Sequence, residues 1–133
     1  MDLKSLSRIL LYFSVIYNIM GFISFAFPAT IGKAAELPAP PQLIYSVFGA
    51  GTILIWAFVY LYLARQREFN RPLLWVGVAG KLNIFTALLI AWAANEIPLK
   101  PLLMGGVDLF MGCVWLSYLL TNQGQVTKSS DIR

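Results

Sequence analysis

Two full charges, Lys81 and Asp108, lie inside long apolar stretches of this sequence. If those stretches cross a membrane, each charge costs at least about 2.5–3.5 kcal/mol at the centre of the bilayer. Charged groups in this position usually face the interior of a helix bundle, where they pair with other polar groups or mark a path for ions and substrates. The two residues therefore indicate a buried polar site.

Other polar and aromatic side chains fall near the same depth. Counted along straight helices, Lys81 lies about 12 Å, Asn18 about 14 Å and Asp108 about 20 Å from one membrane face. The gap of about 8–9 Å between the two charges is wide for direct contact, but the long lysine stem spans most of it. The candidate ligand-binding or buried polar cluster comprises Asn18, Lys81, Asp108, Tyr17, Trp56, Trp115, Tyr45 and Tyr60.

Each apolar stretch carries a stripe of small, polar or aromatic residues at helical spacing. We expect these stripes to face the bundle interior, with Leu, Ile, Val and Phe turned to lipid. The stripes are Ser14, Tyr17, Asn18, Gly21 and Ser24; Tyr45, Gly49, Thr52, Trp56 and Tyr60; Gly77, Lys81, Ile84 and Leu88; and Gly105, Asp108, Gly112 and Trp115.

Two interpretations of this cluster stay open at this point. Lys81 and Asp108 form a structural ion pair in one of them, with Asn18 as a hydrogen-bond partner and the aromatic rings as core. In the other, the same residues line a functional pocket. Lys81 holds an anionic head group there, and Asp108 orients Lys81 or binds the complementary group of the ligand.

Composition excludes several classes of function. Of the 133 residues, 59% are hydrophobic and 12% are charged, whereas a soluble domain carries roughly 25% charged residues. There is no histidine and only one cysteine, Cys113, so His-dependent nucleophile pairs and an internal disulfide are absent. Asp108 is the only aspartate in an apolar stretch, which argues against an intramembrane aspartyl protease. We predict no catalytic residues, no metal, no cofactor and no nucleic-acid partner.

Four apolar stretches supply the elements that position the cluster. They cover about residues 9–27, 44–64, 73–94 and 102–120, and each is close to the ~20 residues that a membrane-spanning helix needs. The sequence therefore predicts an all-α, polytopic membrane protein in which residues 1–120 form a four-helix transmembrane bundle. Residues 121–133 form a polar tail.

The distribution of basic residues predicts the orientation. Seven of them would lie on one side of a four-span protein, namely Lys4, Arg8, Arg65, Arg67, Arg71, Lys128 and Arg133. Only Lys33 and Lys100 lie on the other side, beside Glu36 and Glu96. The positive-inside rule then places both termini in the cytoplasm, as in a bacterial-type inner membrane.

A faint internal repeat is present. The segment Glu36-Leu37-Pro38, with Pro41 after it, resembles Glu96-Ile97-Pro98 with Pro101 after it. Both segments precede a returning helix. The pattern is consistent with two repeated helical hairpins related by an axis along the membrane normal.

The whole pattern resembles the DoxX-like small four-helix bacterial membrane proteins over about residues 4–120. The features shared with that family are the basic start, a Tyr-Asn-x-x-Gly step, a proline after the first span, a Gly-Lys step and a late aspartate: Lys4, Arg8, Tyr17, Asn18, Gly21, Pro28, Gly80, Lys81 and Asp108. The resemblance implies a small membrane subunit, in some members linked to quinone or sulfur redox.

Three functional hypotheses follow. The leading one is a non-enzymatic bundle that binds a small amphipathic or lipid-like ligand, or that serves as accessory subunit of a larger membrane complex. A second is a homodimeric transporter that couples protons or cations through Asp108. A third and weakest one is a lipid-modifying enzyme.

Overall fold

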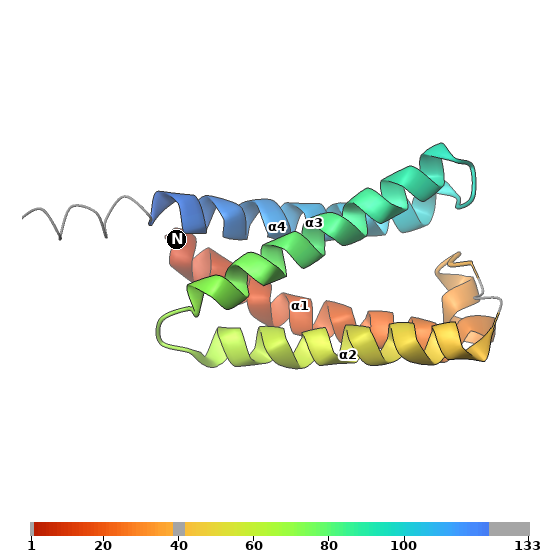
Figure 1. The fold of residues 1–133 in the computed structure, drawn as a ribbon, viewed down its shortest axis with the longest axis horizontal. Coiled ribbons are helices and arrows are strands. Elements are labelled where there is room, and N and C mark those ends of the chain that lie inside the picture. The colour runs from red at the N-terminus through yellow and green to blue at the C-terminus, as the bar shows by residue number, and fades with distance from the viewer. Residues whose placement is uncertain (1, 39–41, 123–133) are drawn as a thin grey trace, which may run out of the picture.

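Four long helices form the described part of the chain, residues 2–38 and 42–122 of a computed structural model (Figure 1). They are α1 (Leu3–Ala26), α2 (Leu43–Arg65), α3 (Arg71–Ala93) and α4 (Leu99–Thr121), with a short π-helix, η1 (Pro28–Gly32), after α1. Each long helix is long and apolar enough to cross a membrane. The predicted all-α four-helix bundle is therefore confirmed, while residues 123–133 of the predicted tail lie outside the described part.

Side-chain caps determine where two of the helices begin, and these positions differ from the ends of the apolar stretches. Helix α1 begins at Leu3 rather than near residue 9, because Asp2 Oδ1 accepts a hydrogen bond from the Ser5 backbone N–H at 2.6 Å. Asn70 caps α3 in the same way through Leu73 N at 3.1 Å. Side-chain caps of this kind satisfy N–H groups that have no partner within the helix.

The helices form two antiparallel hairpins, α1–α2 and α3–α4 (Figure 1). The backbones of α1 and α4 approach each other and join the hairpins, whereas the backbones of α2 and α3 come close at few positions. The bundle therefore has two layers that are held together mainly along one side. Whether the hairpins arose by duplication stays a prediction.

Both hairpins reverse direction through the same helix cap. Glu36 and Asn95 have positive φ angles of 59° and 60°. The following residues close the cap: Leu37 N donates to Gly32 O at 3.0 Å, and Glu96 N donates to Ala91 O at 2.9 Å. This is the Schellman arrangement. It pairs Glu36 with Asn95, one residue away from the register of the sequence repeat, whose Pro41 lies outside the described residues.

Charged side chains fasten one end of the bundle, which we call the basic end (Lys4, Arg8 and the α2–α3 connection). Arg8 donates to the carbonyls of Gln66 and Arg67 at 2.9 and 3.0 Å. Arg71 donates to Leu119 O at 2.8 Å, near the C-terminus of α4, where unpaired carbonyls favour a cation. These hydrogen bonds join α1 to the α2–α3 connection and α3 to α4 at this end.

Fewer polar contacts join the hairpins at the opposite end, which we call the far end (η1 and the α3–α4 connection). Lys100 Nζ donates to Ala34 O at 2.7 Å and lies 3.5 Å from Glu36. All these groups are exposed.

Candidate functional site

A direct ion pair lies at the centre of the predicted cluster. Lys81 Nζ of α3 lies 2.5 Å from Asp108 Oδ1 of α4, and the two residues are 3% and 6% exposed. The lysine stem closes the height gap expected from the sequence. Both residues belong to the α3–α4 hairpin, so this ion pair can form without the α1–α2 hairpin.

The α1–α2 hairpin covers this pair with an amide and two aromatic rings. Asn18 Oδ1 lies 3.4 Å from Lys81 Nζ. The ring centroids of Tyr17 and Tyr60 lie 5.5 and 5.1 Å from the same ammonium, within the range of cation–π attraction. The ammonium is therefore surrounded by partners from α1, α2 and α4.

Aromatic side chains continue from this point toward the basic end. Tyr60 lies between Trp56 and Trp115, with ring centroids 5.6 and 5.3 Å apart. Trp115 is fully buried, and its indole N–H donates to Ser7 O at 3.3 Å. Trp115 therefore belongs to the core that joins α1 to α4, one step away from the charges.

Glycines on α3 and α4 make room for these groups. A Cβ on Gly77 would lie 3.3 Å from the Tyr60 ring, and one on Gly80 would lie 3.7 Å from Trp56. A Cβ on Gly112 would lie 3.4 Å from Lys81 Cβ. Small residues at helix contacts in membranes allow such close approach, so the rings of α2 rest directly on the α3 backbone.

Tyr45 is a correction to the predicted cluster. Its side chain is 58% exposed near the start of α2, far along the chain from Trp56 and Tyr60. Helix α2 instead buries Ser46 and Ala50, whose small side chains let it pack closely on α1. The predicted inward stripe is therefore wrong at this end of α2, and Thr52 and Ile84 are exposed as well.

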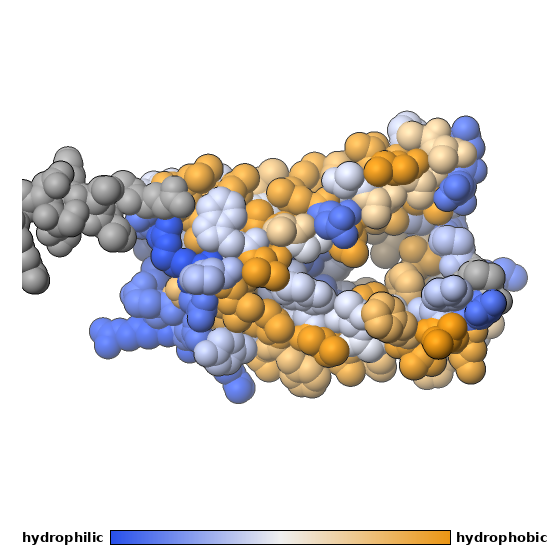
Figure 2. Space-filling view, in the orientation of Figure 1, coloured by the Kyte–Doolittle hydropathy of each residue, from blue (hydrophilic) through white to orange (hydrophobic). Residues whose placement is uncertain are grey.

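A hollow lies beside the site, between the surfaces over α2 and α3 (Figure 2). Few residues of α2 and α3 come close to each other. Trp56 of α2 lies against Gly80 of α3, whereas Tyr17 turns to α4, where its hydroxyl donates to Met104 O at 2.7 Å. Asn18 and Trp56 are half-buried, whereas Lys81 and Asp108 are buried.

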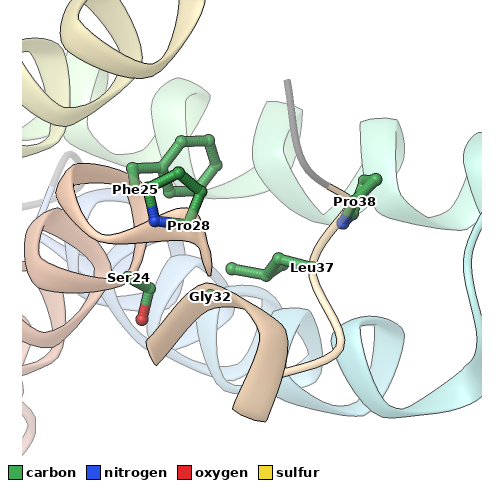
Figure 3. A pocket seen from close by; sticks show the side chains of 6 residues that line it. All are labelled: Ser24, Phe25, Pro28, Gly32, Leu37 and Pro38. Atoms are coloured by element: carbon green, nitrogen blue, oxygen red, sulfur yellow. The ribbon is translucent and has the colours of Figure 1, made fainter. Parts of the chain in front are cut away.

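A separate small cavity lies at the far end, under the π-helical turn (Figure 3). It is lined by Ser24, Phe25, Pro28, Gly32, Leu37 and Pro38. A Cβ on Gly32 would lie only 2.8 Å from the backbone oxygen of Ser24. This cavity is mostly apolar and holds no charged side chain, so it supports the turn rather than a reaction.

Sequence reasoning overlooked two polar residues. Arg8 was interpreted as an orientation signal and as part of the basic start, although it also donates to two carbonyls of the α2–α3 connection. Asn83 is an exposed amide in the middle of α3. A count of uncharged amides within the apolar stretches would have identified Asn83 beside Asn18.

Comparisons of the chain with protein-family models, with curated proteins and with solved structures give no significant match. Among residues 2–38 and 42–122, no three Cys, Asp or Glu side chains are grouped so that they could hold a metal ion. The Lys81–Asp108 site is therefore the feature of this protein that bears on its function.

Proposed function

We propose that this protein is a membrane bundle that binds a small amphipathic, lipid-like molecule between its two hairpins. The observation that carries the proposal is the polar site at the hairpin junction, where Asn18 lies 3.4 Å from Lys81 and Trp56 of α2 lies against Gly80 of α3, together with the hollow between the surfaces of α2 and α3 (Figure 2). A polar cluster beside an opening at membrane depth suits a ligand with one polar end and one apolar end.

The ion pair favours a neutral, hydrogen-bonding head group over the anionic one expected from the sequence. Lys81 and Asp108 neutralise each other in direct contact, and an added ionic group would leave one charge without compensation. Both hydrogen bonds of Asn18, to Lys81 Nζ and to Ile53 O, measure 3.4 Å, which is beyond the usual range. Its amide is therefore available to a carbonyl or hydroxyl of the ligand.

The apolar part of the ligand would lie along the hollow, against Trp56. This hollow faces the surface that a bilayer would surround, so access from lipid requires no passage through water. The fastened basic end blocks the path toward the termini. The ligand would enter and leave between α2 and α3.

Charge supports one membrane orientation. Lys4, Arg8 and the arginines of the α2–α3 connection lie at the basic end, and we propose that this end faces the cytoplasm of a bacterial-type inner membrane. The transport alternative has weaker support, because its coupling carboxylate, Asp108, is held by Lys81. The lipid-modifying alternative lacks an acid–base pair other than these two residues.

Native mass spectrometry of the protein, extracted in mild detergent with its endogenous lipids, tests the proposal. We expect the wild-type chain to retain a defined small molecule and Asn18→Leu to lose it while remaining helical. Asn83→Leu is the matched control, because it removes an amide from the outer face of α3 and should keep the molecule. Equal retention in all three proteins, or none in the wild type, would contradict the proposal.

A further inference from the structure

An unpaired amide lies on the outer surface of α3, away from the site described above. Asn83 is exposed, and within the described residues its side chain makes no hydrogen bond. It lies twelve residues after Arg71 and ten before Ala93, which places it about 18 Å and about 15 Å from the two helix ends. The amide is therefore at the depth where hydrocarbon offers no hydrogen-bond partner.

The surface around Asn83 suits close contact with another helix. Ala79 and Ala87 lie one turn before and one turn after it, and both are exposed. Their small side chains flank Asn83 on the same face of α3, and small residues at a helix surface let two helix backbones approach in a membrane. Thr86 on the same side needs no partner, since its hydroxyl donates to Leu82 O at 2.8 Å.

In Figure 2, a hydrophilic patch interrupts the largely hydrophobic surface over the middle of α3. Buried polar groups are costly in lipid unless they are paired, so the patch calls for a polar partner from outside this chain.

We propose that two copies of this chain dimerise through the outer faces of their α3 helices, with the two Asn83 amides hydrogen-bonded to each other. An amide carries both donors and an acceptor, so in two copies related by a two-fold axis each Asn83 can donate one hydrogen bond to the other and accept one from it. This interface lies outside the hairpin junction and goes beyond the proposed ligand binding.

The depth of Asn83 favours a second copy over an unrelated membrane helix. Two copies inserted in the same orientation present Asn83 at the same height by symmetry. A different partner would need a polar group at that same depth, about 18 Å from the basic end of α3. A homodimer therefore requires no second, independently placed polar group.

Native mass spectrometry and disulfide trapping in proteoliposomes test the dimer. We expect the wild type to be dimeric, and Asn83→Leu to raise the dissociation constant at least about tenfold. Asn83→Gln keeps the amide and should retain the dimer, as should Asn18→Leu. Failure of the dimer and failure of ligand binding are thus separated by two matched amide variants.

Trapping uses a Cys113→Ser background, which removes the exposed native thiol. Ala87→Cys should form an intermolecular disulfide under mild oxidation, whereas Ile55→Cys, 64% exposed on α2, should not. Ala87→Phe should block dimerisation sterically without touching the amide. A monomeric wild type, or a dimer that survives both Asn83→Leu and Ala87→Phe, would overturn the proposal.

Discussion

Lys81 and Asp108 pair at 2.5 Å within one hairpin, and the groups that surround the ammonium come from the other hairpin. The α3–α4 hairpin thus supplies both charges, while the α1–α2 hairpin supplies the aromatic rings and the Asn18 amide. When the hairpins dock, the α1–α2 hairpin therefore covers a pair whose net charge is already zero. The ion pair sets where the hairpins meet, and burying it costs less desolvation free energy than burying a lone charge would.

Removing one member of the pair should destabilise the bundle more than removing both. Lys81→Met leaves a buried carboxylate and Asp108→Leu leaves a buried ammonium, and each single variant should lose about 3–5 kcal/mol of unfolding free energy. The double variant should recover most of this loss, since two apolar side chains replace a neutral pair. Unfolding in mixed detergent micelles, followed by circular dichroism, measures the three values.

A double variant no more stable than either single would contradict this account of the pair. Ile55→Ala, on the exposed face of α2, serves as a control for a nonspecific effect of mutation. It should change the unfolding free energy by less than about 0.5 kcal/mol.

Two glycines should respond in opposite directions to alanine. At Gly32 the new methyl group would lie 2.8 Å from the Ser24 backbone oxygen, so Gly32→Ala should cost about 1–3 kcal/mol. At Gly106 in α4 nothing lies within 4 Å, and Gly106→Ala should add up to about 1 kcal/mol through helix propensity. Thermal unfolding of the two variants distinguishes these outcomes, and equal shifts in one direction would refute the assigned packing.

The fold was predictable because the membrane allows few alternatives. Helices of about 20 apolar residues are what a bilayer requires, and Lys81 and Asp108 were identifiable as partners because a charge at that depth needs one. Both inferences use the cost of leaving polar groups unpaired in hydrocarbon. That cost depends only on sequence and depth.

The rotation of α2 about its own axis was not predictable in the same way. This helix is apolar all round and carries no charged residue before Arg65, so no costly group fixes its inward face. The aromatic stripe suggested that Tyr45 faces inward, but α2 buries the small residues Ser46 and Ala50 and leaves Tyr45 exposed. Helix α2 packs mainly on α1, and the sequence of α2 alone does not specify which of its faces does so.

The π-helical turn after α1 was also not predictable from the sequence. Pro28 correctly indicated the end of α1, but the chain then continues as η1 instead of an irregular loop. Gly32 N donates to Phe27 O at 3.1 Å, five residues back. The wide turn brings Gly32 so close to α1 that a Cβ there would lie 2.8 Å from the Ser24 backbone oxygen, and local propensity does not reveal this approach.

Loss of Arg8 should loosen the basic end specifically. Its guanidinium donates to two loop carbonyls and lies 5.3 Å from the centroid of the Phe69 ring. Arg8→Met should remove about 1.5–3 kcal/mol of local stability, as expected for hydrogen bonds to a charged group. Hydrogen exchange of residues 66–70 should accelerate accordingly. Arg65→Met, at the exposed end of α2, is the control, and equal exchange in the two variants would argue against the role of Arg8.

The ion pair between Lys4 and Glu68 should make stability at the basic end depend on pH. A hydrogen bond from Lys4, together with its charge, lowers the pKa of Glu68 below the ordinary value of 4.5. A group whose pKa is depressed on folding contributes stability above its unfolded pKa and loses it as pH falls through the folded value. The wild type should therefore lose Tm relative to Glu68→Gln as pH falls from about 5 toward about 3. The difference should be small, because both side chains are exposed and solvent screens the pair. Parallel Tm curves for the two proteins over that range would show that the pair contributes nothing to folding.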